Sequence, residues 1–489
     1  MILSSFILEN YRSIERVEFK ISEIDNSKTY GLLGINESGK SSFLKGLSLI
    51  DKKDLKYNQD FYDDKNPVVV KLKYHLLSHE LEEIKSELSS EVEEELLNDL
   101  NITEIEIEIN YSADVNLNKI ITENIQFKKD TFEDYTILAN KIIKIQPDQN
   151  DQEPFSFSDF FLKQKPNFFY ERSHNVIFWK SSPEYLFLDE IDLNLFLRDP
   201  EKTSIPLFNC FLLSGIEKDK IANVISTLNS ASAISNLQAR LGDTITQYVN
   251  LVWPEHPVSF RFIISANKIS LLVDDNDVLY QSKTTSQRSD GFKQFVSFLL
   301  TVSAERKSQK LDNTILLIDE PETHLHPPAQ INLLKELINI TKNTNNICFF
   351  ATHSNYLIDK QYLSRNYKIK KENNKTTKIE QIPDKLTTFS EVNFDVFNIL
   401  TTDYHNELYG YIFLEDSKEL NKLAKTKKWE DSRNNIVKDV SLSEYIRHSI
   451  HHPENKLNVI YTIDELRESI MALRKIKDKI SKRNKQMTQ

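Results

Sequence analysis

Apolar and polar residues alternate along the N-terminal part of the chain in a way that predicts β-structure. The alternation covers Ile2 to Leu8 and Val17 to Ile21, and a third apolar run, Tyr30 to Leu33, ends at a glycine. The next stretch, Ser41 to Ile50, has apolar residues at helical spacing, and Val68 to Tyr74 reads as another strand. Strands repeat every two residues and helices about every 3.6, so we expect strands, then a helix, then a further strand.

The rest of the chain changes pattern several times. A Glu- and Leu-rich stretch without Gly or Pro, 77–100, is typical of an exposed helix. Short strand-like runs and two aromatic stretches follow before regular patterns return. Those patterns predict a helical run at 216–250, a hairpin of Phe260–Ile264 with Ile269–Val273, a segment Gly291–Ser303, a strand Thr314–Ile318, a helix 329–341, a strand Ile347–Ala351, a hairpin within Lys368–Ile382 and a helical region at 385–489.

Composition narrows the class of protein. The 489 residues are 39% hydrophobic and 28% charged, which indicates a folded globular chain of several domains. The net charge of -11 excludes a polycation, so any nucleic-acid contact needs a local basic patch. Two distant cysteines, Cys210 and Cys348, exclude a disulfide framework. No apolar run approaches the roughly 18 residues of a membrane span, and we expect a soluble cytoplasmic protein without a membrane partner.

The segment after the third strand has the spacing of a phosphate-binding loop. Gly34 to Ser41 fits G-x-x-x-x-G-K-[ST] between an apolar strand and a helix. Gly34 and Gly39 let the backbone amides turn inward, Lys40 reaches the β- and γ-phosphates, and Ser41 supplies a hydroxyl to Mg²⁺. The sequence therefore predicts a site for ATP and Mg²⁺.

A second motif supplies carboxylates to the same site. Four apolar residues, Ile315 to Ile318, form a buried strand that ends at Asp319 and Glu320. Asp319 is expected to orient the Mg²⁺ shell, and Glu320 to polarise the attacking water as a general base. These residues are far from Lys40 in sequence, so a large insertion must leave the nucleotide-binding core and return to it.

Five motifs in order resemble the ABC-type ATPases of the SMC, RecF and OLD (overcoming lysogenisation defect) group. The resemblance covers roughly residues 1–75 and 285–383. The motifs are NYRSI at Asn10–Ile14, GINESGKSS from Gly34, RSDGFKQF at Arg288–Phe295, LLIDEPETHLHP at Leu316–Pro327 and FATHSNYLID at Phe350–Asp359.

The resemblance implies roles for further residues. Ser289 and Gly291 correspond to the signature motif, which contacts the γ-phosphate of ATP on the opposite subunit, although Asp290 and Phe292 depart from the usual Gly and Gln. His353 corresponds to the switch histidine at the γ-phosphate. Gln59 is either a Mg²⁺- and water-sensing glutamine or a plain loop residue, and Arg12 is expected near the nucleotide by analogy. The nucleotide-binding residues implied are Arg12, Gly34, Asn36, Gly39, Lys40, Ser41, Ser42, Ser289 and Gly291, with Ser41, Asp319 and Gln59 at the metal.

A domain plan and an oligomeric state follow from this resemblance. We expect an α/β fold, a P-loop ABC-type ATPase core split by a large mixed α/β and helical insertion, followed by an all-helical C-terminal domain. The predicted ranges are 1–75 and 285–383 for the two lobes of the ATPase, 76–284 for the insertion, lid and dimerisation region, and 384–489 for the C-terminal domain. Because the signature acts in trans, a homodimer or higher oligomer with ATP between its heads is predicted.

The C-terminal region carries a weaker motif. Arg447 and His452 have the R-x4-H spacing of HEPN domains, which are helical bundles often found as ribonucleases in defence proteins. In such an enzyme His452 moves a proton and Arg447 stabilises the charged phosphorane, while His448 or His451 could share the role of His452. A His-rich helix end ahead of Pro453 explains the same residues without catalysis. A Toprim nuclease is disfavoured, because Glu415-Asp416 lacks the usual glycine and a following Asp-x-Asp.

These observations predict an ATPase of a bacterial anti-phage defence system. The ATP-dependent dimer would sense or clamp an RNA or DNA target and control a nuclease effector, either its own HEPN-like region or a separate nuclease partner, as in the Septu or PARIS systems. A DNA-repair ATPase similar to RecF is a further alternative, which the negative charge of the chain disfavours.

Overall fold

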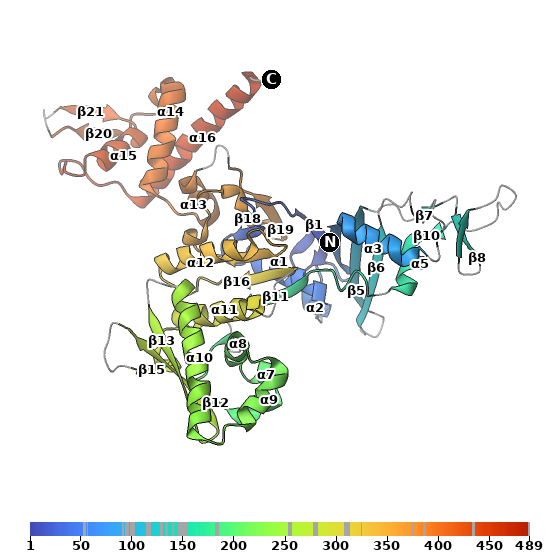
Figure 1. The fold of residues 1–489 in the computed structure, drawn as a ribbon. Helices are drawn as coiled ribbons and strands as arrows, with labels where there is room; N and C mark the ends of the chain where they lie inside the picture. The colour runs from blue at the N-terminus through green and yellow to red at the C-terminus, as the bar shows by residue number, and fades with distance from the viewer. Residues whose placement is uncertain are drawn as a thin grey trace. The chain divides into compact units, whose positions relative to one another are not determined.

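The computed structural model divides the chain into two compact units, Met1–Ile382 and Pro383–Gln489, which are described separately below. Both units are drawn in Figure 1. The residues that the structure describes are 1–51, 55, 57–89, 92, 97, 103–113, 119–127, 131–132, 135–138, 141–144, 155–165, 167–180, 185–252, 257–276, 282–307, 313–323, 325–373, 375–384, 388–432 and 436–487.

A six-stranded sheet forms the centre of the first unit. Its order is β11-β16-β17-β3-β18-β19, with parallel pairs throughout except for the antiparallel edge strand β19. Strands β3, β16 and β17 are buried along almost their whole length because both faces of the sheet are covered. The strands are β3 Thr29–Leu33, β11 Asn175–Lys180, β16 Thr314–Asp319, β17 Ile347–Thr352, β18 Asn366–Glu372 and β19 Thr376–Gln381.

Alternate residues of the central strands enter two different hydrophobic cores. Ile315 and Leu317 pack with helix α1 (Lys40–Leu47) and the N-terminal strands, whereas Leu316 and Ile318 pack with α12 (Pro327–Thr341). This alternation is the period of two that a strand imposes on its side chains. The predicted helix at 329–341 and the strands on either side of it are confirmed, and α12 is the crossover between β16 and β17.

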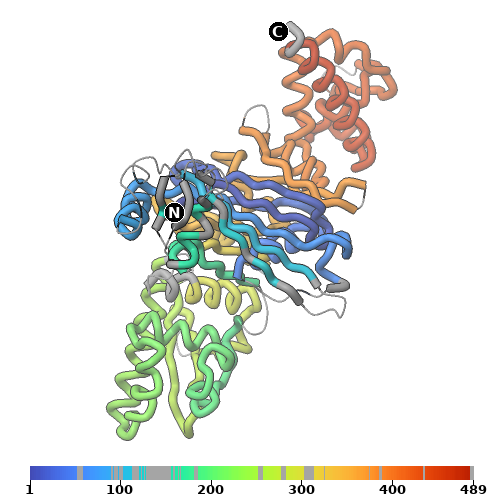
Figure 2. Tube along the Cα trace, turned by 90° about the vertical axis from the view of Figure 1, so that its right-hand side faces the viewer, coloured from blue at the N-terminus to red at the C-terminus, as the bar shows by residue number. Residues whose placement is uncertain are grey.

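The N-terminal strands form a second, antiparallel sheet in the order β2-β1-β4-β5-β6. Figure 2 shows them side by side in blue and cyan. On β5, the isoleucines 105, 107 and 109 are buried while the glutamates between them are not, so Lys71 of β4 can pair with Glu106 and Glu108. The strands are β1 Ile2–Tyr11, β2 Ile14–Lys20, β4 Val68–His75, β5 Glu104–Ala113 and β6 Lys119–Phe127.

The middle of the chain joins both sheets and adds a helical layer. Strands β5 and β6 extend the N-terminal sheet, and β11 extends the central one, so residues from the predicted insertion lie within the body itself. The predicted helical run and hairpin are confirmed as α9, α10, β13 and β14. The layer comprises β12 Glu190–Asp192, α6 Leu193–Arg198, α7 Pro200–Thr203, α8 Ile205–Leu213, α9 Lys218–Ser226, α10 Ala231–Val252, β13 Val258–Ser265, β14 Lys268–Asp275, β15 Ser282–Thr284 and α11 Asp290–Lys307.

Shorter elements complete the first unit. The expected exposed helix at 77–100 is present as α3 (Ser78–Leu88), and residues 90–91, 93–96 and 98–100 lie outside the described part of the chain. The remaining elements are the 3-10 helices η1 Ser48–Asp51, η3 Thr285–Gln287, η4 Asn355–Leu357 and η5 Leu363–Arg365, the helices α2 Tyr57–Asp60 and α5 Phe157–Gln164, and the strands β7 Thr131–Phe132, β8 Tyr135–Leu138, β9 Lys141–Lys144 and β10 Phe155–Ser156.

The second unit is mainly helical, as the sequence predicts, but the expectation that it is all helical needs a correction. A short hairpin, β20 Lys427–Glu430 with β21 Val437–Val440, lies between its helices. Trp429, Val440 and Tyr445 form a small core under this hairpin. Strands of four residues with one buried side chain each leave too short a pattern to detect. The helices are α13 Phe389–Phe397, α14 Thr402–Asn421, α15 Leu442–His451 and α16 Ile463–Met487.

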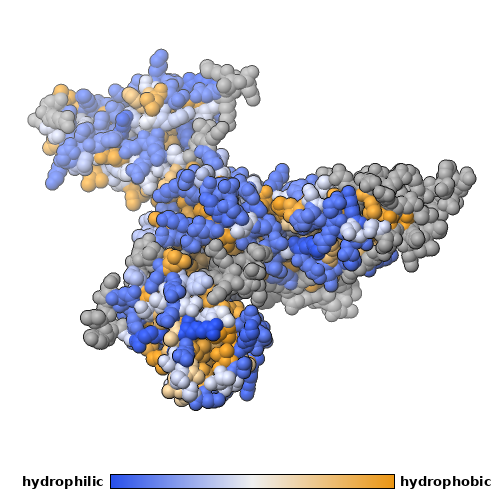
Figure 3. All heavy atoms as spheres, viewed as in Figure 1, coloured by the Kyte–Doolittle hydropathy of each residue, from blue (hydrophilic) through white to orange (hydrophobic). Residues whose placement is uncertain are grey.

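The second unit presents mostly hydrophilic residues on one face (Figure 3), and both cysteines of the chain are buried. On the face shown in Figure 3, hydrophilic residues predominate over the second unit, with apolar residues between them. None of the described helices is long and apolar enough to cross a membrane. Cys210 and Cys348 are both fully buried, and burial raises the pKa of each thiol.

A buried arginine, Arg365, links the segment between β17 and β18 to the segment around the start of β3. Arg365 is 1% exposed, and its Nε donates to Asp359 Oδ2 at 2.8 Å. Its Nη atoms donate to Ser27 Oγ at 3.1 Å, to the Thr29 carbonyl at 3.2 Å and to the Ile24 carbonyl at 2.9 Å. The planar guanidinium thus satisfies a carboxylate and the loop before β3 at once.

Replacing this arginine by an apolar side chain should destabilise the first unit. In Arg365→Met the Asp359 carboxylate stays buried without its cation. Breaking a buried ion pair in this way should lower the free energy of unfolding by about 3–5 kcal/mol. Denaturant unfolding followed by fluorescence measures the change. Arg198→Met, at an exposed position on α6, is the matched control, and equal losses in the two variants would contradict this role of Arg365.

Candidate nucleotide site

Strand register brings the predicted motifs to one edge of the central sheet. Leu33 of β3 pairs with Thr352 of β17, and Asp319 of β16 pairs with Ala351. The residues that follow these three strands therefore begin at the same level. Ligands of parallel α/β sheets bind outside the carboxyl ends of the strands. This edge is the candidate site.

Two glycines shape the loop between β3 and α1. Gly39 has φ 109°, and a Cβ there would lie 2.2 Å from Thr377 Oγ1 of β19. A Cβ on Gly34 would lie 2.6 Å from the Ile369 carbonyl oxygen. Glycine is thus required at both positions by space, and at Gly39 also by backbone conformation. Gly39 precedes α1, so the N-terminus of that helix opens into the loop.

Lys40 lies inside the loop with its amine close to the other site residues. Its side chain is almost fully buried, and Nζ donates to the carbonyls of Gly34 at 2.8 Å and Ile35 at 3.0 Å. Nζ also lies 3.5 Å from His353 Nδ1. Burial lowers the pKa of Lys40 to about 8, against the opposing effect of Glu320, Asp319 and Glu322. The buried ammonium group has lost part of its hydration, so binding of an anion beside it is favourable.

Ser41 and Asp319, the residues expected at the metal, are in contact with one another. Ser41 Oγ donates to Asp319 Oδ1 at 3.0 Å. Burial raises the pKa of Asp319, and the bond from Ser41 opposes that rise. A hydroxyl and a carboxylate are hard oxygen ligands of the kind Mg²⁺ uses together with water and phosphate oxygens. The donor set therefore fits Mg²⁺.

An unpaired hydroxyl in the same loop fits a phosphate. Ser38 Oγ is buried and makes no hydrogen bond with any described residue. A buried donor without an acceptor is costly, and a phosphate oxygen in the loop would accept from it. Asn36 is exposed at the tip of the loop and Ser42 is half-buried in α1.

Glu320 and His353 form the second pair of the site. Glu320 follows β16 with φ 53°, a left-handed conformation held by its N–H, which donates to the Ala351 carbonyl at 3.0 Å. Its Oε1 lies 3.2 Å from His353 Nε2. Burial, and then the charge of Lys40, lowers the pKa of His353. A neutral imidazole can donate from Nε2 to Glu320 and accept at Nδ1 from Lys40.

The signature residues lie elsewhere in the same chain. Ser289 precedes α11, and its Oγ accepts a hydrogen bond from the Phe292 amide at 3.3 Å. The neighbouring Arg288 pairs with Asp275 of β14 at 2.6 Å. Among the described residues, no hydrogen bond joins Ser289 or Gly291 to the loop. The structure therefore does not unite this motif with Lys40 within one chain.

Arg12 and Gln59 are also separate from the loop. Arg12 forms an ion pair with Asp60 at 2.7 Å and lies over the Tyr11 ring. Gln59 is exposed on the short helix α2. No hydrogen bond or ion pair joins either side chain to Gly34–Ser41 in the described part of the chain. Their nucleotide and metal roles stay predictions.

The sequence profile of one protein family, described as "AAA domain, putative AbiEii toxin, Type IV TA system", matches residues 30–359. This range is more than half of the chain and contains the loop, both carboxylates and His353. The chain belongs to this AAA domain family. Membership confirms an ATPase domain of the group that the ordered motifs indicate, whereas the HEPN-like nature of the second unit stays a prediction.

More distant similarities are limited in extent. The Old nuclease of Escherichia phage P2 is 25% identical over 91 residues, which are 19% of this chain and only 15% of that protein. An SMC head bound to the C-winged helix domain of ScpA shares 12% identity, covering 79% of this chain and 99% of that one, with a TM-score of 0.41. The SMC head domain from Thermotoga maritima shares 11% identity over 78% and 99% of the two chains, with a TM-score of 0.37.

Two residues of the AAA domain site were missed by sequence reasoning. Glu322 accepts hydrogen bonds from residues at the end of β17, and its only sequence signal is its place two residues after Glu320. The Thr377 side chain packs against Gly39. Its amide donates to the Ser13 carbonyl at 2.7 Å, and its Oγ1 donates to the Ser38 carbonyl at 3.4 Å. Thr377 carries no recognisable motif.

In the second unit, Arg447 and His452 have different contacts, although burial and then the charges of both lower the pKa of His448, which lies between them in sequence. The Arg447 guanidinium lies over the rings of Tyr409 and Phe413, at 4.5 and 5.8 Å from their centroids. His452 instead lies beside His448, with ring centroids 6.3 Å apart, and its Nδ1 is 3.3 Å from Glu454 Oε1. No hydrogen bond joins Arg447 to His452 among the described residues, and their catalytic roles stay predictions.

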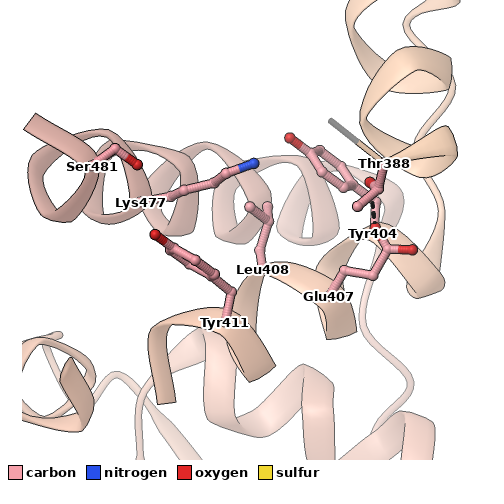
Figure 4. A pocket seen from close by; sticks show the side chains of 7 residues that line it. All are labelled: Thr388, Tyr404, Glu407, Leu408, Tyr411, Lys477 and Ser481. Carbon is pink, nitrogen blue, oxygen red and sulfur yellow. Dashed lines mark hydrogen bonds between the residues drawn. The ribbon is translucent and has the colours of Figure 1, made fainter. Parts of the chain in front are cut away.

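Among the described residues of the second unit, two of the hollows bear on its chemistry. The smaller, about 110 Å³, contains both histidines and is lined by Trp429, Asp431, Ser432, Lys438, His448, His452, Glu454 and Asn455. The larger, about 300 Å³, lies between α14 and α16, where the Lys477 side chain extends toward Tyr404 (Figure 4). Its charged groups already have partners, since Thr388 donates to Glu407 at 2.6 Å and Lys477 to Glu391 at 2.8 Å.

The depressed pKa of Lys40 predicts how ATP binding depends on pH. Phosphates favour the ammonium form, so binding raises a pKa that is about 8 in the free chain. Below pH 8 the amine is already protonated and affinity is steady. Above pH 8 the chain must take up a proton on binding, so affinity falls with rising pH by up to about tenfold per unit.

Isothermal titration calorimetry between pH 7 and 9.5 measures this dependence, and buffers of different ionisation enthalpy report the proton taken up. ATP itself is fully ionised above pH 8 and adds no slope there. A constant affinity over the range, without proton uptake, would show that Lys40 keeps an ordinary pKa in the loop.

Proposed function

We propose that this chain hydrolyses ATP at the edge of β3, β16 and β17, and that ATP-dependent pairing of two chains controls a nuclease effector in anti-phage defence. The observation that carries the first part is the continuous set of contacts from Ser41 and Asp319 through Glu320 and His353 to Lys40. The family description supports the defence role, because it names a toxin and a toxin–antitoxin system.

Each residue has a part in hydrolysis that its surroundings support. Bound Mg²⁺ would supply charge neutralisation at the phosphates, held by Ser41 and Asp319. Lys40 binds phosphate oxygens from within the loop. Glu320 accepts the proton of the attacking water, and His353 orients that carboxylate from 3.2 Å. The left-handed turn at Glu320 directs its carboxylate to this place.

Pairing of two chains is proposed because the signature residues lie apart from the loop. Ser289 stands at the start of an 18-residue helix, α11, where amide groups can bind a phosphate. In one chain no hydrogen bond joins these groups to Lys40 among the described residues. A second chain could bring its own Ser289 to the nucleotide, and two ATP molecules would then lie at the interface.

The effector has two candidates. His448 and His452 share a hollow with Lys438, which supports proton transfer by the second unit itself. The carboxylates of Asp431 and Glu454 line the same hollow, and their charges oppose a phosphate. This supports the alternative of a separate nuclease partner, of the Septu or PARIS kind.

Glu320→Gln should stop turnover while leaving ATP binding intact. The amide keeps its size but cannot accept the proton of water, so kcat is expected to fall at least about 100-fold. Phosphate release measures kcat, and fluorescent-nucleotide titration measures affinity. Glu15→Gln, at an exposed position on β2, is the matched control.

The same variant tests the pairing of chains. ATP held by Glu320→Gln should double the mass measured by light scattering, and Ser289→Arg in that background should prevent the doubling. A mass unchanged by ATP would exclude the ATP-held dimer. Turnover by Glu320→Gln within threefold of the unaltered chain would exclude Glu320 as the base.

The second unit can be tested as a ribonuclease directly. If it is the effector, the purified chain cleaves single-stranded RNA in the presence of ATP, and Arg447→Ala with His452→Ala removes at least 100-fold of that activity. Gel analysis of labelled RNA measures the rate. Absence of cleavage by the unaltered chain would assign the nuclease to a separate protein, and full activity of the double variant would exclude Arg447 and His452 as the catalytic residues.

A further inference from the structure

A third carboxylate, Glu322, lies beneath the reacting residues of the nucleotide site. It is in the turn after β16, two residues beyond Glu320, and only 8% of it is exposed. Its Oε1 accepts two hydrogen bonds, from Thr352 Oγ1 at 2.6 Å and from the His353 amide at 2.8 Å. Its Oε2 is buried and has no hydrogen-bond partner among the described residues.

These bonds join the ends of two neighbouring strands. Thr352 is the last residue of β17, and His353 is the first residue beyond the ladder that pairs β17 with β16 and β3. The His353 amide can no longer bond to a neighbouring strand there, and Glu322 accepts it instead. The backbone that carries the imidazole is therefore held by a side chain from the turn of Glu320.

The turn itself also depends on this contact. Glu320 has a left-handed backbone, which is unfavourable for a residue with a Cβ. Its carbonyl accepts from the Thr323 amide at 3.3 Å and from Thr323 Oγ1 at 2.9 Å, which closes a tight turn around Glu322. A side chain buried from the middle of that turn restricts its movement relative to β17.

The buried carboxylate of Glu322 lowers the stability of the fold unless its hydrogen bonds compensate for lost hydration. Removing an ionised group from water is unfavourable unless hydrogen bonds replace the water. Burial raises the pKa of Glu322, and the two bonds from Thr352 and His353 lower it. An apolar residue would fill the space without this cost, but it would leave the Thr352 hydroxyl and the His353 amide without their acceptor.

We propose that Glu322 is a positioning residue of this site, which fixes the His353 imidazole relative to Glu320 Oε1 and Lys40 Nζ and so sets the rate of hydrolysis rather than the affinity for ATP. The inference rests on the proposed ATPase function. Glu322 acts through the His353 backbone, because both of its hydrogen bonds, made by Oε1, go to the end of β17.

A double-mutant cycle with His353 tests this role. Glu322→Ala should lower kcat about 10- to 100-fold and change KM for ATP less than threefold, because Glu322 makes no hydrogen bond to the described residues of the loop or to Asp319, and its charge has the smallest effect on Lys40 of the three nearby carboxylates. In a His353→Ala background the same substitution should have almost no further effect on kcat. Glu322→Gln retains an acceptor oxygen for both bonds and should stay within about threefold of the unaltered chain. Glu15→Ala is the control for removal of an exposed carboxylate.

Hydrogen–deuterium exchange of the segment that contains His353 gives a measurement that does not depend on turnover. Glu322→Ala should speed exchange at the end of β17, and Glu322→Gln and Glu15→Ala should not. Unchanged exchange in Glu322→Ala would overturn the proposal even if the chain hydrolyses no ATP. Equal losses of kcat with and without His353, or a rise in KM as large as the fall in kcat, would overturn it in an active enzyme.

Discussion

Parallel pairing of β3, β16 and β17 is the constraint on which the nucleotide site depends. Each strand is followed by one short segment of the site. The register places Leu33 opposite Thr352 and Asp319 opposite Ala351, so the three strands end within one residue of the same height in the sheet. A slip of one residue would turn Ile315 and Leu317 into the wrong core, so burial on both faces fixes the register. Chemistry that is spread over most of the chain is thereby assembled by the packing of apolar side chains.

The assembly explains why so much of the chain separates Lys40 from Glu320. The intervening residues add strands to both sheets and form the helical layer that covers one face of β16 and β17. They are therefore part of the body that sets the register. The same packing sets the charges of the site. Burial weakens the hydration of Lys40 and Asp319, so these groups interact more strongly with one another and with a bound ligand.

The fold of the first unit was largely predictable because its strands and helices have strong periods and the motif at Gly34–Ser41 fixes a known turn. The sequence also indicated that Ser41 and Asp319 share a site, whereas the contact between Glu320 and His353 was not predicted. Thr377 could not be predicted, because its role depends on the antiparallel return of β19 beside the loop. The hairpin β20–β21 escaped detection because four-residue strands carry almost no periodic signal.

The burial of both native thiols has a practical consequence. Cys210 and Cys348 have no exposed surface, and the raised pKa of each keeps it protonated and unreactive at neutral pH. A single cysteine introduced at an exposed position would be the one fast-reacting thiol in the native chain. Spectroscopic labels can therefore be attached to either unit without first removing the natural cysteines, and distances between the units can be followed through the ATP cycle.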